Sequence, residues 1–133
     1  MIELRLDVTP VPKGRPRMNR KTGSVYTPIT TAQFEKEVAW QAKVAMKGQP
    51  PLEGPLSVVI GAWLPMPNSF TKPVRQAAME GGVFPRGDVD NFAKAVMDAL
   101  NGIVWLDDNQ ITQLTATKRY SSAPALTVTV REA

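Results

Sequence analysis

The chain has 133 residues, of which 43% are hydrophobic and 21% are charged, so it has enough apolar material for one domain with a packed core. It contains no cysteine and no histidine, which excludes disulfides, thiolate nucleophiles, imidazole bases and zinc sites built on these residues. Catalysis would therefore depend on carboxylates, lysine, arginine, tyrosine, hydroxyl groups, or a hard cation such as Mg²⁺ or Mn²⁺ held by oxygen atoms.

The charges of the chain, which sum to +4, gather in two opposite groups. The segment 13–21 contains no acid and five cations, namely Lys13, Arg15, Arg17, Arg20 and Lys21, whereas five of the six aspartates lie within 88–108. No apolar run approaches the about 18 residues of a membrane helix, and the amino terminus lacks the pattern of a secretion signal. We therefore expect one cytoplasmic domain over 1–133 that makes no contact with a membrane.

The first third of the chain predicts a strand, an exposed loop and a helix. Residues 2–9 alternate apolar and polar side chains, which is typical of a half-buried strand. The stretch 10–28 combines four prolines, two glycines and five cations, which favours an exposed loop. A solvated loop and a loop that contacts phosphates both fit this composition. Apolar residues at helical spacing from Phe34 to Ala45 then predict a helix over 31–47.

The later segments predict three more strands around a long loop. Residues 56–66 are rich in branched and aromatic side chains, as in a buried strand. Residues 66–89 show little periodicity and indicate a surface loop, either one that gates a substrate or one that is simply mobile. Residues 110–120 and 125–133 resemble two strands joined as a hairpin. We expect the three tryptophans to lie in the core, namely Trp40, Trp63 and Trp105.

A short amphipathic helix is predicted within the acidic stretch, starting near Asp90 and stopping at Asn101 and Gly102. At about 100° per residue, its apolar and polar side chains fall on opposite sides. The apolar side carries Phe92, Ala95, Val96, Ala99 and Leu100, and the polar side carries Asp90, Asn91, Lys94, Asp98 and Asn101.

The aspartates around this helix form a candidate metal site. Asp88 and Asp90 are two residues apart and point the same way on an extended backbone. Two carboxylates about 4 Å apart repel by about 4 kcal/mol at an effective dielectric of about 20, and a divalent cation would reverse this repulsion. Lys94 follows one turn after Asp90, and one aspartate of the pair 107–108 would complete the site. In such a site the three aspartates can hold Mg²⁺ with several waters, and the site can support phosphodiester hydrolysis.

Each of these residues also has a simple structural interpretation. Asp90 would cap the helix, Asp98 would lie on a solvated face, and the pair 107–108 would form a polar turn. Lys94 would form a surface ion pair. The residue pattern alone is compatible with both interpretations.

The run from Asp88 to Ile111, DVDNFAKAVMDALNGIVWLDDNQI, resembles the signature of the RusA family of Holliday junction resolvases. Two aspartates flank one residue, an asparagine follows, and a lysine lies four residues after the second aspartate. Further along come Asp-Ala-Leu and an aromatic residue before a paired aspartate. The order of predicted strands and helices is similar to that family over nearly the whole chain.

The resemblance implies a small homodimeric α+β endonuclease, with a mixed sheet and two helices in the order β-α-β-α-β-β. Such an enzyme would bind four-way DNA junctions, require Mg²⁺ with no small-molecule cofactor, and make paired symmetric nicks. The metal-binding aspartates carry over to Asp88, Asp90 and Asp108, and the catalytic lysine to Lys94. Asp98 and Asp107 match two further positions of the motif. The resemblance also suggests a phage or prophage source.

The segment KGRPRMNRKTGSVYTP is similar to only part of that family, so it leaves the range of substrates open. We expect its cations, Lys13, Arg15, Arg17, Arg20 and Lys21, to contact DNA phosphates without reading sequence. Arg86, Lys118 and Arg119 are further candidates for the path of the DNA. Two alternatives stay open: a metal-dependent nuclease for flaps, forks or plain duplex, and a DNA-binding protein without catalysis.

Overall fold

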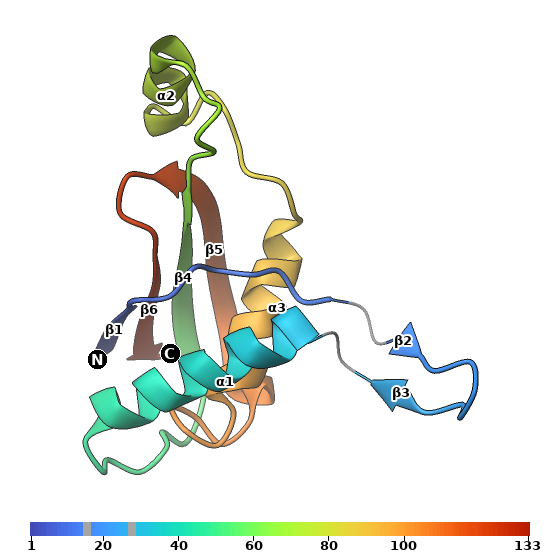
Figure 1. Cartoon of the computed structure of the whole chain (residues 1–133). Helices are drawn as coiled ribbons and strands as arrows, with labels where there is room; N and C mark the ends of the chain where they lie inside the picture. The colour runs from blue at the N-terminus through green and yellow to red at the C-terminus, as the bar shows by residue number, and fades with distance from the viewer. Residues whose placement is uncertain (15–16, 27–28) are drawn as a thin grey trace.

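The computed structural model describes residues 1–14, 17–26 and 29–133, and a four-stranded mixed sheet forms its centre (Figure 1). The strands lie in the order β1-β6-β4-β5, with bounds Ile2–Leu6, Ala125–Glu132, Leu56–Pro65 and Ile111–Ser121. β4 runs parallel to β5 and antiparallel to β6, and β1 is antiparallel to β6. The fold is therefore the α+β class that the sequence predicted.

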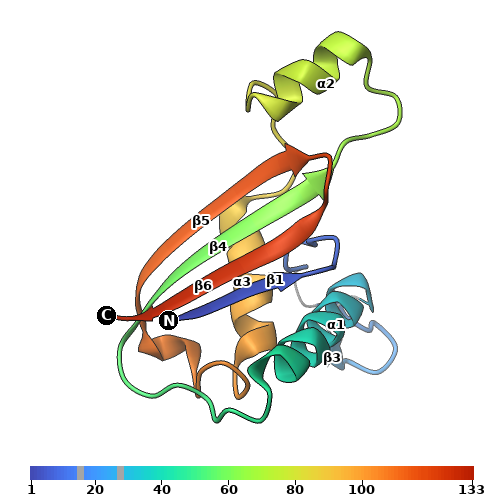
Figure 2. The ribbon, with the colours of Figure 1, turned by 90° about the vertical axis from the view of Figure 1, so that its left-hand side faces the viewer.

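Two helices, α1 (Ile29–Met46) and α3 (Val89–Leu100), pack on one face of this sheet (Figure 2). The spacing predicted most of their buried faces: α1 buries Phe34, Val38 and Ala42 but leaves Ala45 exposed, and the five apolar positions named for α3 are all buried. These side chains form one core with the inward residues of β1, β4 and β6. Within the described residues no helix is long and apolar enough to cross a membrane.

The sequence predicted two helices, but the described residues form three. The third helix, α2 (Lys72–Met79), lies within the predicted loop 66–89 and extends beyond the end of the sheet (Figure 1). Its first turn contains Pro73, a residue that fits the start of a helix because its missing N–H needs no partner there. Eight residues are fewer than the 11–18 over which helical periodicity becomes visible, so the pattern did not reveal it.

The predicted hairpin at the carboxyl end is also wrong, because β4 lies between β5 and β6 and pairs with both. The short link 122–124 passes across the end of β4 (Figure 2). The inner position suits β4 because half of its residues are buried, whereas no residue of β5 is buried. Alternation along a strand indicates which face is buried but does not identify the neighbouring strand.

The three tryptophans differ in their surroundings. Trp105 is fully buried, as expected, and Trp63 is half-buried with its indole N–H donating to Thr127 Oγ1 (2.9 Å). Trp40, however, is 64% exposed. It follows the buried Val38 by two residues, which rotates it by about 200° to the outer face of α1. The prediction of a core position is therefore wrong for Trp40, and Trp63 does not belong to the core cluster either.

A small antiparallel hairpin, β2 (Arg17–Met18) with β3 (Val25–Tyr26), lies within the segment predicted as an exposed loop. It forms a sheet of its own and projects away from the body of the molecule (Figure 1). The residues between its strands are exposed. The part of the basic segment from residue 17 to residue 21 therefore lies on a two-stranded arm that reaches outward from the domain.

Candidate active site

The backbone turn that leads into α3 requires a glycine at position 87. Gly87 has a φ of +95°, a conformation that side chains other than glycine rarely adopt. A Cβ at this position would lie 2.9 Å from Cε2 of Phe92 and 3.4 Å from Cγ of Pro12. Glycine thus allows the chain to turn tightly between these two rings. This turn determines where the next residue, Asp88, leaves the loop.

Asp88 and Asp90 stand at the exposed start of α3. The helix begins at Val89 with Asp88 as its N-cap, which lies two residues before Asp90, the cap that the sequence suggested. The Asp88 side chain makes no capping hydrogen bond, and Asp90 Oδ1 accepts only a local bond from the N–H of Asn91 (3.0 Å). Neither carboxylate forms an ion pair with a described residue. Both are therefore available to a ligand.

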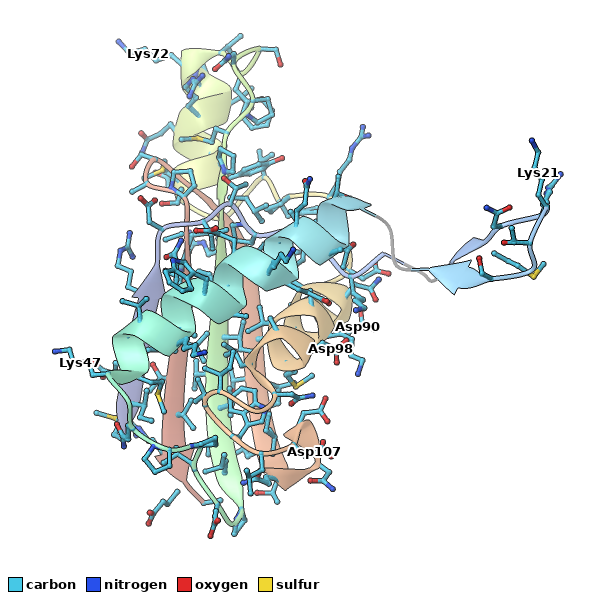
Figure 3. All side chains as sticks on the ribbon, turned by 60° about the horizontal axis from the view of Figure 1, so that its bottom comes forward. Lys21, Lys47, Lys72, Asp90, Asp98 and Asp107 are labelled. Atoms are coloured by element: carbon cyan, nitrogen blue, oxygen red, sulfur yellow. The ribbon has the colours of Figure 1, made fainter. Side chains whose placement is uncertain are left out.

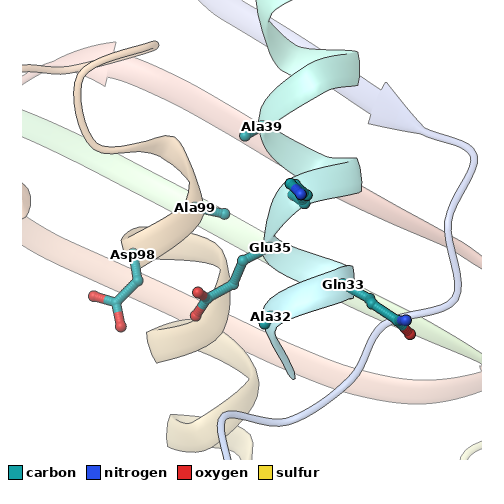
Figure 4. Close-up of a pocket in the computed structure, with 7 residues that line it drawn as sticks. Ala32, Gln33, Glu35, Ala39, Asp98 and Ala99 are labelled. Atoms are coloured by element: carbon teal, nitrogen blue, oxygen red, sulfur yellow. The ribbon is translucent and has the colours of Figure 1, made fainter. Parts of the chain in front are cut away.

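Lys94 and the second half of α3 belong to a chain of ion pairs. Lys94 Nζ lies 2.9 Å from Asp98 Oδ1 and 3.7 Å from Asp108 Oδ2. Lys13 Nζ lies 3.1 Å from the other Asp98 oxygen and 2.6 Å from Glu35 Oε1. Figure 3 shows Asp90 and Asp98 along α3, and Figure 4 shows Glu35 of α1 facing Asp98. The structure thus brings Lys94 and Asp108 together from separate elements.

These contacts shift the pKa values of both lysines upward. The hydrogen bond to Asp98 raises the pKa of Lys94, although burial opposes it. For Lys13, burial lowers the pKa, but hydrogen bonds to Glu35 and Asp98 outweigh that effect and raise it overall. Both ammonium groups therefore stay positively charged at neutral pH. Glu35 was not anticipated, because a single acid on a helix gives no sequence signal for a distant partner.

The adjacent aspartates 107 and 108 have different environments. Asp107 caps the short 3₁₀ turn Asp108–Gln110: its Oδ1 accepts from the N–H of Asn109 (3.1 Å), and Gln110 Oε1 accepts from the N–H of Asp107 (2.9 Å). The Asn109 bond, with a second from the Asp108 side chain, lowers the pKa of Asp107. Burial, followed by its hydrogen bond with Asp107, raises the pKa of Asp108. Asp107 thus serves the turn while Asp108 faces Lys94.

The donor atoms around α3 suit a hard cation. All are carboxylate oxygens, and Mg²⁺ is commonly held by one or two protein carboxylates together with waters and substrate phosphates. Asp88 and Asp90 meet that requirement in residue type and exposure. Across the described ranges, no group of three or more acidic side chains is arranged to share one metal ion. A joint site of Asp88, Asp90 and Asp108 therefore stays a prediction.

Strand β5 anchors the loop that carries Asp88. Lys118 Nζ donates to the carbonyl oxygens of Pro85 (2.7 Å) and Gly87 (2.5 Å), and lies 5.7 Å from the centre of the Phe84 ring. Lys118 pairs in register with Ala62, which places it on the face of the sheet that α3 covers. The sequence suggested that Lys118 lines the DNA path. In the structure its ammonium holds the backbone that leads to Asp88, and contact of Lys118 with DNA stays a prediction.

The predicted DNA-binding cations lie in three situations. Arg20 and Lys21 are exposed in the turn of the β2–β3 hairpin (Figure 3). Lys13 is held by the ion pairs described above, and its backbone N–H donates to the carbonyl of Asn91 (2.8 Å). Arg15 and the side chain of Arg17 lie outside the described part of the chain. Contact of these cations with DNA stays a prediction, and Lys13 additionally joins the basic segment to α3.

Lys94 and the carboxylates of Asp88 and Asp90 lie along the polar side of α3, and these are residue types that metal-dependent phosphodiester hydrolysis uses. The chain belongs to the RusA endodeoxyribonuclease family, since the family described as "Endodeoxyribonuclease RusA" matches residues 7–131. Members of this family are DNA endonucleases that act on branched junctions. The chain is also 36% identical over 131 residues to the "Uncharacterized protein YqaN" of Bacillus subtilis (strain 168), covering 92% of this chain and 90% of that protein.

Proposed function

We propose that this protein is a Mg²⁺-dependent Holliday junction resolvase that works as a homodimer and nicks two opposed strands symmetrically. One observation carries the proposal. Asp88 and Asp90, at the exposed start of α3, have no cationic partner among the described residues, and Lys94 follows one turn later. This combination suits a site that receives a metal ion and a phosphodiester.

The metal would be held by Asp88 and Asp90, with Asp108 as the third aspartate of the site. When bound, Mg²⁺ supplies a water of lowered pKa and positive charge beside the scissile phosphate. Mn²⁺ would substitute, because it accepts the same oxygen ligands.

Lys94 would act on charge that develops during cleavage. Asp98 holds its ammonium at 2.9 Å, and the raised pKa keeps it protonated. A fixed positive charge stabilises negative charge on the scissile phosphate or on the leaving oxygen. Asp98 would thus orient Lys94, while Asp108 lies close enough (3.7 Å) to link the lysine to the metal ligands.

The β2–β3 hairpin would bind the DNA backbone. Arg20 and Lys21 lie exposed on an arm that projects from the body, where no described acid pairs with them. Arg15 and Arg17 lie in the same segment. Contacts of this kind position DNA and weaken steeply as salt rises. One domain supplies one site, so paired nicks require two copies related by a two-fold axis.

The test is cleavage of a synthetic immobile four-way junction, with every strand resolved on a denaturing gel. We expect paired nicks at symmetric positions with Mg²⁺ and none with a chelator. Linear duplex, flap and fork substrates compete in the same reactions. Preferential cutting of flaps or forks would identify a nuclease of different specificity, and tight junction binding without nicking under any divalent metal would identify a protein that only binds DNA.

A further inference from the structure

A cavity of about 470 Å³ lies at the ends of β4 and β5, close to the start of α3. Leu64 and Tyr120 are paired in the sheet and form its floor. Its other walls come from the loop before α2, the loop before α3 and the segment after β1, namely Phe70, Pro85, Arg86 and Thr9. We call this cavity the end-of-sheet pocket. It is built from segments that are far apart in the chain.

The walls of the end-of-sheet pocket are held by hydrogen bonds. Arg75 of α2 donates to the carbonyls of Phe70 (3.2 Å) and Pro67 (3.3 Å), which anchors the loop before α2. Lys118 donates to the carbonyl of Pro85 (2.7 Å) on the opposite wall. The rings of Phe70 and Tyr120 meet edge to face, 5.4 Å apart with an angle of 78°. The pocket is therefore formed before any ligand arrives.

The chemistry of the pocket suits a planar aromatic ring. Phenylalanine, tyrosine and proline present apolar faces, and nucleobases stack on such side chains in proteins that bind single-stranded nucleic acid. Arg86 is exposed at the rim and forms no ion pair with the described acids, so it is free to contact a phosphate or stack on a base. These features together fit one nucleotide rather than a purely apolar ligand.

The larger cavity of about 520 Å³, between α1 and α3, does not suit such a ligand. Small alanine side chains and the carboxylates of Glu35 and Asp98 line it (Figure 4). Among its lining residues it offers no aromatic face on which a base could stack, and its two carboxylates are already paired with Lys13. The end-of-sheet pocket is therefore the better candidate for contact with DNA.

The pocket is also close to the proposed site of cleavage. Arg86 precedes Asp88 by two residues, and consecutive Cα atoms are about 3.8 Å apart, so the two Cα atoms lie within about 8 Å. Successive nucleotides of one strand are spaced by about 3.4 Å along a duplex. The pocket and the start of α3 are thus neighbours along the chain, so one DNA strand could contact both.

We propose that the end-of-sheet pocket receives one nucleobase, unstacked from the DNA strand next to the cut, against Phe70 and Tyr120. This inference rests on the proposed function. Removing a base from the stack costs least where it is already mismatched or single-stranded. A pocket that must be filled before cleavage favours branched DNA over intact duplex, in addition to any recognition of its shape.

The test combines protein variants with abasic DNA. Each nucleotide flanking the cut is replaced in turn by an abasic site, and junction affinity is measured in chelator and cleavage in Mg²⁺. Loss of stacking of one base on one ring corresponds to about five- to 150-fold. We expect one abasic position to weaken binding or cleavage by wild-type protein within this range. Phe70→Leu and Tyr120→Ala should each reduce binding or cleavage of the intact junction by a similar factor. On the junction with that abasic position, the same variants should cause little further loss.

Two variants serve as controls. Tyr120→Phe keeps the ring and should behave like wild type, and Met79→Ala changes an exposed α2 side chain that does not line the pocket. Thermal unfolding of each variant verifies that it is folded. The inference fails if the wild type cuts junctions but, at every abasic position, removing an aromatic ring reduces affinity and cleavage by the same factor as on intact DNA. The pocket would then receive no base. If the wild type neither binds nor cuts junctions, the proposed function fails instead.

Discussion

Replacing Lys118 with methionine tests whether strand β5 holds the loop before α3, and with it Asp88, in place. Methionine keeps the apolar length of the side chain and removes the donors to Pro85 and Gly87. A hydrogen bond from a charged group contributes about 1.5–3 kcal/mol, so two bonds at the lower limit amount to about 3 kcal/mol. Gly87 is exposed, so water would replace part of the lost hydrogen bond to its carbonyl group. The free energy of unfolding should therefore fall by about 2 kcal/mol. For a chain of this length, Tm should fall by about 7 °C.

The effect of Lys118→Met on cleavage should exceed its effect on binding. A displacement of about 1 Å at a reacting group can reduce the rate by about 10²-fold, and the lost bonds release the residue directly before Asp88. Junction affinity in chelator should change less than threefold, because the ammonium faces carbonyl groups of the protein. Lys118→Arg, which keeps a cationic donor, should recover part of the cleavage rate.

The matched control for this experiment is Lys72→Met, which removes an exposed lysine of α2. It should leave Tm and the cleavage rate close to wild type. Cleavage by Lys118→Met within threefold of wild type would refute the positioning role. A parallel loss of affinity and of the salt dependence of binding would instead make Lys118 a DNA contact.

Three further changes test the site and the hairpin. Asp90→Asn should abolish cleavage and leave junction binding intact or stronger, because a negative charge is removed; nicking at the wild-type rate would remove Asp90 from the site. Gly87→Ala should cost about 1–3 kcal/mol, measured by denaturant unfolding, because alanine is strained at positive φ and its Cβ would meet Phe92; an unchanged midpoint would contradict this. Arg20→Ala with Lys21→Ala should reduce the slope of log affinity against log salt by about 1.8, and an unaltered slope would take both residues off the DNA path.

The sequence predicted the helices and strands that depend on periodicity within one segment. In α3, Phe92, Val96 and Leu100 recur at helical spacing, and all three are buried as expected. The start of that helix was misplaced because Asp88 and Asp90 are both good capping residues, and only the backbone distinguishes them. Local pattern therefore determined the face of the helix more accurately than its first residue.

The features that the sequence did not reveal depend on contacts between distant segments. The insertion of β4 between the last two strands depends on which strand buries more surface, which is decided by the whole fold. The pairing of Lys13 with Glu35 joins residues 22 positions apart on different elements. Nothing in the sequence indicated that Lys118 has partners within the protein. Its register with Ala62 places it beneath the loop before α3. Each of these facts requires the tertiary structure.

The exposure of Trp40 gives the protein an internal optical probe. Its indole faces solvent on α1, whereas Trp105 is enclosed by the core and Trp63 is held by Thr127. Iodide in solution will quench the emission of the first and spare that of the buried one. Association of two copies through the outer surface of α1 would shield Trp40 and shift its emission to the blue. Intrinsic fluorescence can thus follow assembly during DNA binding without any attached dye.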